Sequence, residues 1–442
     1  MLFGFTALMV FMVLPGRVAM LLVFLGGWVL LPFGSFSPVP KGTLAWWVTG
    51  LALPGDVLIS KAWVAPVAAL VGGILFDRKQ LAGFRPAFVD MPITAWCLWP
   101  FANALILGSA DPAPLPAAAY LVGSWGVPWA IGRIWFSDSA GQRALLIGLA
   151  LAGCACLPFA LLEGWRGPFL HDLIYGPHPF RYDGDGRYIW HRPLGFFEHG
   201  NQYGIWASLC AVAAIWWVID AGKNRGAPRW AAALASALAV ASQSVGAIIL
   251  GTAAVAAMRF WSKRVVRYAT LFVIELAIVA GAVQVSGLIP VRSFVEQTAA
   301  GQATLAMIRA TGRASFAWRV SQDLKTLDGV RAAPFTGNGR WDWWRRFGTR
   351  PWGLFMLIAG QYGFAGLALA CGSLLIAAAR VLARRPHPVQ ASAAIALAMI
   401  TLAGLGDAIL NAFLFFPAIL AAGAIGATVS KRDEEGIDDE RS

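Results

Sequence analysis

Long apolar stretches separated by shorter polar segments run along almost the whole chain. A helix needs about 20 apolar residues to cross the hydrocarbon core of a bilayer. The pattern therefore predicts an all-α polytopic membrane protein with about 12–14 membrane-spanning helices. The predicted segments are 2–14, 18–33, 42–53, 60–76, 91–107, 115–136, 144–162, 202–219, 230–241, 245–260, 266–285, 353–381, 390–410 and 412–429.

Three of these segments, 2–14, 42–53 and 230–241, are shorter than the rest. Each could cross a thin part of the bilayer, re-enter from one side, or form half of a broken helix. The helix count is a range for this reason.

The distribution of Lys and Arg among the short loops predicts the orientation. Loops such as 109–114 and 242–244 contain neither residue, whereas the loops that alternate with them are basic. By the positive-inside rule the basic loops are cytoplasmic. These basic loops are 78–85, 223–229, 263–267 and 384–385.

Residues 1–429 are accordingly predicted to form a single transmembrane domain with both termini inside. Residues 430–442 form an acidic tail that we expect to be cytoplasmic and disordered. Two long segments, 163–201 and 286–352, fall on the outer side.

Composition agrees with a membrane protein and argues against two other classes. Hydrophobic residues make up 58% of the chain and charged residues 13%, whereas a soluble domain carries about 25% charge. One large soluble core is excluded because soluble domains split beyond roughly 250–300 residues. The net charge of +12 does not indicate a nucleic-acid partner, since the basic residues lie between apolar segments instead of on one face.

The second outer loop, 286–352, contains nine Arg and one Lys against four acidic residues. A solvated helical lid would explain this charge, but so would an anion site. The preference for Arg favours the anion site, because the planar guanidinium binds phosphate through two parallel hydrogen bonds. Part of the loop is predicted to be an amphipathic helix on the outer membrane surface, with an apolar stripe at Phe316, Val320, Leu324 and Leu327.

The first outer loop, 163–201, holds the densest group of polar residues, including four of the five His. An ordinary polar loop is the alternative to a site here. Asp183-Gly-Asp185 is similar to the DxD element that holds a metal on a nucleotide-sugar, but Asp-Gly-Asp-Gly is also ordinary turn chemistry, and we predict a turn and no metal site. The sequence contains no phosphate-binding P-loop, HExxH motif or nucleophile elbow.

The end of this loop carries a resemblance. Arg192-Pro-Leu-Gly195-Phe-Phe-Glu-His-Gly-Asn201, leading into an apolar segment, resembles the R-x-x-G-x-x-x-x-x-N element of the O-antigen ligase and polymerase superfamily. Further elements resemble that family in the same order. They are Ser242-Gln-Ser244, Trp318-Arg319, Pro334-Phe-Thr-Gly337-Asn-Gly339 and Gln361-Tyr-Gly363-Phe-Ala-Gly366, with a looser match at Ser60-Lys61.

The resemblance implies a fold of the glycosyltransferase C type in the inner membrane of a bacterium, with its active site facing the periplasm. It implies a donor glycan linked by diphosphate to a polyprenol, transfer to a hydroxyl of a saccharide acceptor, inversion, and no metal or other cofactor. Membrane lipids and, for some members, a chain-length regulator or export complex are the expected partners.

The same resemblance suggests roles for individual residues. We expect Arg192 to bind the diphosphate, with Glu198 or His199 orienting or deprotonating the acceptor hydroxyl; His199 could instead only bond the backbone of its own turn. The residues expected to assist in substrate binding are Arg187, Arg313 or Arg319, Asn201 and Gly195.

Two departures from the family pattern argue against a lipid A-core ligase and leave a polymerase of surface polysaccharide or exopolysaccharide repeat units, or a member that acts on another acceptor. The ligase-type histidine, implicated in handling the acceptor, is replaced by Trp352, and the Arg of the Ser-x-Ser-Arg element is replaced by Val245. The alternatives are an O-antigen ligase that transfers glycan to lipid A-core, a polysaccharide transporter or flippase, and a non-catalytic export component. Charged residues inside the apolar segments, which a transporter would need, are few: Lys61, Arg133, Glu275 and Asp407 are the notable ones.

Overall fold

The computed structural model describes residues 2–32, 60–178, 186, 188–286, 297–310, 314–383, 393–409, 411–413 and 416–426. Most of these residues are helical, and no β-strand occurs among them. The predicted all-α class is therefore confirmed for this part of the chain. The segment 42–53 and the tail 430–442 lie outside the described residues.

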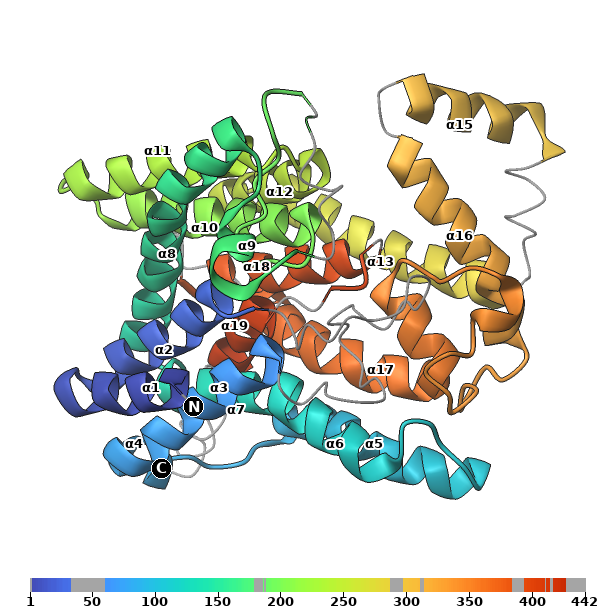
Figure 1. Ribbon diagram of the computed structural model, residues 1–442, viewed down its shortest axis with the longest axis horizontal. Helices are drawn as coiled ribbons and strands as arrows, with labels where there is room; N and C mark the ends of the chain where they lie inside the picture. The colour runs from blue at the N-terminus through green and yellow to red at the C-terminus, as the bar shows by residue number, and fades with distance from the viewer. Residues whose placement is uncertain are drawn as a thin grey trace.

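The helices follow the apolar segments closely (Figure 1). In the first half they are α1 Leu2–Val13, α2 Gly16–Leu30, α3 Lys61–Phe76, α4 Arg78–Ala82, α5 Met91–Leu107, α6 Pro114–Leu121, α7 Val127–Trp135, α8 Ser139–Arg166 and α9 Leu170–Tyr175. In the second half they are α10 Gly200–Asp220, α11 Gly226–Ala241, α12 Val245–Phe260, α13 Arg264–Ser286, α15 Ala299–Ala310, α16 Ala314–Arg331, α17 Leu354–Ala383, α18 Ala393–Ala408 and α19 Phe416–Gly426.

Two of the predicted segments are interrupted. The segment 115–136 consists of α6 and α7 joined by the π-helical turn Val122–Gly126. Helix α17 bends at Gly363, whose φ of 70° lies in the left-handed region. The Cβ of any other residue at this position would lie 2.1 Å from the Phe335 carbonyl oxygen, so both the conformation and the close approach require glycine.

Three helices among the described residues, α8, α10 and α17, are long and apolar enough to cross a membrane. Shorter apolar helices accompany them: α1, α2, α3, α12, α18 and Pro417–Gly426 of α19. Within the described residues the structure is therefore all-helical, with three helices long and apolar enough to span a bilayer alone.

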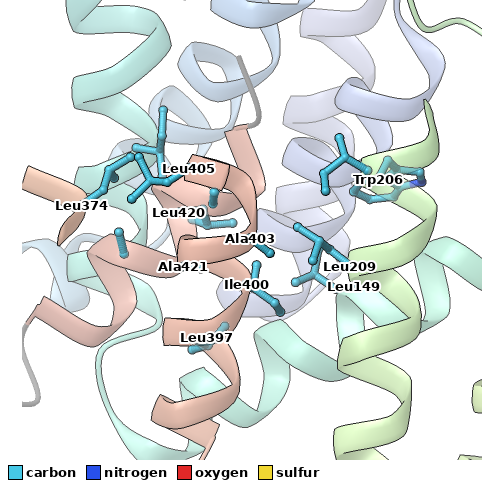
Figure 2. Close-up of a cluster of buried hydrophobic side chains, with 14 of the residues drawn as sticks. Leu149, Trp206, Leu209, Leu374, Leu397, Ile400, Ala403, Leu405, Leu420 and Ala421 are labelled. Carbon is cyan, nitrogen blue, oxygen red and sulfur yellow. The ribbon is translucent and has the colours of Figure 1, made fainter. Parts of the chain in front are cut away.

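Helix α18 lies at the centre of the core, where side chains from five helices meet (Figure 2). Close helix contacts rely on small residues, as is typical of helix packing in membranes. Between α7 and α19, for example, a Cβ on Gly132 would lie 2.3 Å from the Leu420 carbonyl oxygen. The labelled core residues are Leu149, Trp206, Leu209, Leu374, Leu397, Ile400, Ala403, Leu405, Leu420 and Ala421.

Helix α16 is the amphipathic helix predicted in the second outer loop, and α15 stands beyond its N-terminal end, away from the other helices (Figure 1). Its stripe residues Leu324 and Leu327 are buried within the protein, whereas the prediction placed the stripe against the membrane surface. Asp323 and Thr326, off that stripe, are buried too. The helix contacts α13 and α17, and the backbone N–H of Trp352 donates to Asp323 Oδ1 at 2.6 Å. The protein therefore covers more of α16 than a helix resting only on a membrane surface would require.

Candidate functional site

The first outer loop is shaped by one buried carboxylate, that of Glu163 near the C-terminal end of α8. Its Oε1 accepts the backbone N–H groups of Phe169 and Leu170, both at 3.2 Å. Its Oε2 accepts those of Leu194 at 2.9 Å and Gly195 at 2.7 Å. Glu163 thereby fastens both the start and the end of the loop to α8. Gly195, at φ 54°, makes the turn that presents its N–H to this carboxylate.

Arg192 is completely buried at the end of this loop. Its Nε donates to the Ser242 carbonyl oxygen at 3.2 Å, and one terminal nitrogen donates to Asn201 Oδ1 at 2.9 Å. The position of Arg192 in a loop suggests a side chain that contributes little to helix packing, and this expectation is wrong. Arg192 joins the first loop to the α11–α12 turn and to the first turn of α10.

A chain of side-chain hydrogen bonds continues from Arg192 to Asp407. Asn201 Nδ2 donates to Asn411 Oδ1 at 3.0 Å, and Arg319 donates to the same oxygen at 2.5 Å. Asn411 Nδ2 in turn donates to Asp407 Oδ1 at 2.7 Å. The arginines of the two outer loops, Arg192 and Arg319, are thus linked through Asn201 and Asn411, and Asp407 fixes the orientation of the Asn411 amide.

The turn between α18 and α19 is the meeting point of this network. The Asn411 carbonyl oxygen accepts the N–H of Leu354 at 3.2 Å, where α17 begins. Trp352, at the position of the ligase-type histidine, lies 5.0 Å from Trp318 between ring centroids. The guanidinium of Arg319 lies 5.7 Å from the centre of the Trp352 ring. An aromatic ring therefore stands beside Arg319 where the resemblance would place an imidazole in a ligase.

His199 precedes α10 and caps it. Its Nδ1 accepts the N–H of Asn201 at 3.1 Å, so the bond to its own turn is present. The ring stacks on Phe413 with centroids 5.3 Å apart. Since Nδ1 serves as the cap, any acid–base role of His199 falls to Nε2.

Glu198 is also completely buried, and two cations act on it electrostatically, Lys61 and Arg350. Lys61 Nζ donates to the Phe196 carbonyl oxygen at 2.9 Å and lies 4.2 Å from the centre of the Phe197 ring. Burial lowers the pKa of Arg350 to about 9, and the charge of Glu198 opposes that shift. Arg350 therefore stays cationic at neutral pH and attracts the Glu198 carboxyl group.

Two motifs far apart in the sequence are brought into contact at the bend of α17. The N–H of Asn338 donates to the Gly360 carbonyl oxygen at 2.8 Å, and the N–H of Gly339 to that of Gln361 at 2.9 Å. The N–H of Phe364, just after Gly363, donates to the Pro334 carbonyl oxygen at 2.7 Å. The 334–339 stretch thus satisfies backbone groups that the bend would leave unpaired.

Five of the eight candidate residues, Arg192, Gly195, Glu198, His199 and Asn201, are close neighbours in the sequence, and among them Asn201 contacts both Arg192 and His199. Arg319 reaches the same network through Asn411. Arg187 and Arg313, like Asp183 and Asp185, lie outside the described residues. No group of three or more His, Cys, Asp or Glu that could hold a metal occurs in the described part of the chain.

Sequence reasoning did not assign Asn411, Asp407 or Arg350 to the site. Asp407 carried a usable signal, because an acidic residue near the end of an apolar segment needs a polar partner. Asn411 and Arg350 carried none, since a single amide or one arginine among nine gives no pattern.

Comparison with known proteins finds no matching family model, no matching curated protein and no matching solved structure. The resemblance to the O-antigen ligase and polymerase superfamily accordingly rests on the short motifs alone.

Proposed function

We propose that this chain is a polytopic inner-membrane glycosyltransferase that moves a glycan from a polyprenyl diphosphate to a saccharide acceptor on the periplasmic side. Its product would be a lengthened surface polysaccharide or exopolysaccharide. The proposal includes the full set of about 12–14 membrane spans and the placement of both long loops outside.

The observation that carries the proposal is the linkage of Arg192 to Arg319 through Asn201 and Asn411. Two guanidinium groups held in one hydrogen-bonded network suit a diphosphate, which offers several oxygens to planar donors. They also suit a reaction whose leaving group gains negative charge, because donors fixed in advance need no reorganisation.

In the proposed reaction the oxygen of an acceptor hydroxyl attacks the anomeric carbon of the donor sugar. The new carbon–oxygen bond forms as the bond to the phosphate oxygen breaks, and the bonding electron pair leaves with the polyprenyl diphosphate. The proton of the hydroxyl passes to a base of the protein. Arg192 and Arg319 would hold the diphosphate through this change, and no metal is part of the scheme.

Glu198 and His199 are the candidates for that base. Glu198 interacts electrostatically with Lys61 and Arg350. His199 would act through Nε2, because Nδ1 caps α10. Such a base contributes about 10²–10⁴-fold to the rate.

We favour a polymerase over a lipid A-core ligase because Trp352, and no imidazole, stands beside Arg319. A transporter is less well supported. Arg133, in the last turn of α7, forms an ion pair with Asp90 at 2.8 Å, and Asp407 accepts a hydrogen bond from Asn411. Both charged side chains therefore bind partners within the protein, and neither marks a substrate pathway between the helices.

The direct test is glycan transfer by the purified chain in nanodiscs, supplied with polyprenyl-diphosphate-linked repeat units. We expect longer lipid-linked glycans and release of polyprenyl diphosphate in equal amounts. A different result would contradict the proposal: the monodisperse purified protein leaves the repeat units unchanged, whereas native membranes extend them only when they contain this protein. The protein would then be a supporting component and not the transferase.

A further inference from the structure

Tyr188, Ile189 and Trp190 form a short exposed apolar segment, which we call the apolar finger, two residues before Arg192. Their exposed fractions are 59%, 60% and 64%. Large apolar side chains exposed side by side mark a contact surface when they are held in place.

One side chain holds the finger from the α11–α12 turn. Gln243 Oε1 accepts the N–H groups of Tyr188 at 3.0 Å and Ile189 at 3.2 Å. Its Nε2 donates to the carbonyl oxygens of Ile189 at 2.6 Å and His191 at 3.0 Å. The Gln243 side chain thus supplies the hydrogen bonds that the backbone N–H and C=O groups of this segment would otherwise make in a helix or strand.

The backbone on both sides of this clamp is strained. Trp190 has a φ of 55° and Gln243 a φ of 53°, and among the described residues they are the two non-glycine residues with positive φ. Such conformations persist only where the surrounding contacts impose them. The finger is therefore built to expose its side chains, because a relaxed loop of this length could turn them inward.

The finger lies at the end of α8, one of the helices long and apolar enough to cross a membrane. The N–H of His191 donates to the Gly164 carbonyl oxygen at 2.9 Å, and the Trp190 ring lies beside Gly164. The neighbouring Trp165 is 71% exposed, and Phe159 one turn and a half earlier is 52% exposed. Exposed apolar side chains therefore lie on this end of α8 as well as on the finger.

We propose that the apolar finger, together with Trp165, binds the outer surface of the lipid bilayer at the boundary between headgroups and acyl chains. Trp and Tyr favour this boundary because each has an apolar ring and one polar group. The inference rests on the proposed function in one respect, the crossing of the membrane by α8.

Contact with lipid would also set the depth of Arg192. Ser242 accepts the hydrogen bond from Arg192 Nε, and the next residue, Gln243, holds the finger. The α11–α12 turn therefore contacts both the finger and the buried Arg192. Lipid headgroups bound at the finger would lie at the same depth as the hydrogen-bonded network of Arg192.

The test is photocrosslinking in nanodiscs of phosphatidylethanolamine and phosphatidylglycerol, with p-benzoylphenylalanine placed singly at Ile189, Phe159 and Asp328. Asp328 is a solvent-exposed position of α16 that serves as the control. We expect lipid adducts at 159 and 189 and few at 328, measured by mass spectrometry of the intact protein. In the Gln243→Ala background, adducts at 189 should fall several-fold while those at 159 stay unchanged.

The outcomes separate this inference from the proposed function. Adducts at 159 with none at 189 would overturn the finger as a lipid contact and leave the membrane placement of α8 intact. No adducts at either position would overturn both. Crosslinking of 189 to another protein would assign the finger to a protein partner. If Gln243→Ala does not fold, Gln243→Glu, which keeps the acceptor and loses the donor, gives the same comparison.

Discussion

Asn201 and Asn411 are joined side chain to side chain at 3.0 Å, although 210 positions separate them in the sequence. Asn201 begins α10 and binds Arg192, whereas Asn411 lies in the α18–α19 turn and binds Arg319. Each amide uses its oxygen for an arginine, and the Asn201 nitrogen joins the two halves. The pair therefore controls the spacing of the two cations that we assign to the diphosphate.

Replacing Asn411 should separate these two cations. In Asn411→Ala, Arg319 and Asn201 lose their shared acceptor, so we expect weaker donor binding and a transfer rate reduced by about tenfold or more, in line with a coupling of roughly 0.5–3 kcal/mol between contacting residues. A double-mutant cycle with Asn201→Ala, measured by transfer in nanodiscs, gives this coupling. Asn224→Ala, on an exposed turn, is the matched control, and additive effects of the two site substitutions would show that the pair does not act together.

The same pair shows how far the sequence could predict the site. Long apolar stretches located most of the helices, because the length of such a stretch is a property of one segment alone. The motif around Arg192 was likewise local, and its members lie together in the structure. Asn411 could not be found this way, since its role comes from a contact between segments 210 residues apart. Nor could the burial of Arg192, which depends on the carbonyl of Ser242 from another turn.

Helix α16 illustrates a second limit. Its apolar stripe predicted an amphipathic helix on the outer membrane surface, and the helix is present but packs against α13 and α17. The burial of Asp323 depends instead on the N–H of Trp352, which a stripe in α16 cannot reveal. A polar side chain is buried where a backbone group from another segment can hydrogen-bond to it. The sequence of α16 therefore predicted the apolar contacts of the helix but not its buried polar contacts.

Asp323 should make the docking of α16 dependent on pH. Burial raises its pKa from 3.8 to about 6, although the N–H groups of Trp352 and Gly353 and the charge of Arg319 act in the opposite direction. Because the pKa is higher in the folded protein, the favourable contribution is complete below pH 3.8 and is lost as the pH rises through about 6. At roughly 1.4 kcal/mol per pH unit, the ionised form costs up to about 3 kcal/mol.

Asp323→Asn should remove this cost, since the Asn oxygen can still accept both N–H groups. We expect limited proteolysis within 314–352 to be slower for Asp323→Asn than for wild type at pH 7.5 and equal at pH 3.5 or below. Asp328→Asn, an exposed position of the same helix, should behave as wild type at both pH values. Faster proteolysis of Asp323→Asn at pH 7.5 would show that the ionised carboxylate stabilises the docked helix.

The proposed topology places both long loops on the periplasmic side. Reporter fusions after Gly184 in the first loop and after Gln302 in the second should be active as alkaline phosphatase, which requires export, and inactive as a cytoplasmic reporter. Fusions after Lys79 and Lys263, in the basic short loops, should give the opposite result. Cytoplasmic activity at either outer loop would exclude the proposed reaction as well as the topology.

Deletion of the gene should distinguish a polymerase from a ligase. A strain without a polymerase should retain single repeat units on the polyprenol or its acceptor and lack long polymer. We expect the polymerase result because Trp352 occupies the position of the ligase-type histidine and lies beside Arg319. Accumulation of long lipid-linked polymer in the deletion strain would instead identify a ligase, and analysis of lipid-linked glycans by gel electrophoresis reads both outcomes.

Arg192 allows the sharpest test of the site. Its guanidinium is fully buried and divides its bonds between the Ser242 carbonyl and Asn201. Lys would keep the charge but lose the planar fork that can serve two partners and a phosphate at once. We expect Arg192→Lys to reduce glycan transfer by roughly 10²-fold or more, as removal of one fixed transition-state donor does, and Arg192→Ala to abolish it.

Because Arg192 is buried, a loss of activity alone would not prove a role in transfer. Arg192→Ala leaves a cavity and an unsatisfied carbonyl at Ser242, so its monodispersity and thermal unfolding must be compared with those of Arg192→Lys. Arg346→Ala, an exposed arginine of the second loop, is the control and should transfer glycan like wild type. Decisive support would be an Arg192→Lys protein that unfolds at the wild-type temperature, binds polyprenyl diphosphate more weakly and transfers poorly. Wild-type turnover by a folded Arg192→Lys or Arg192→Ala protein would remove Arg192 from the site and, with it, the motif on which the family resemblance chiefly rests.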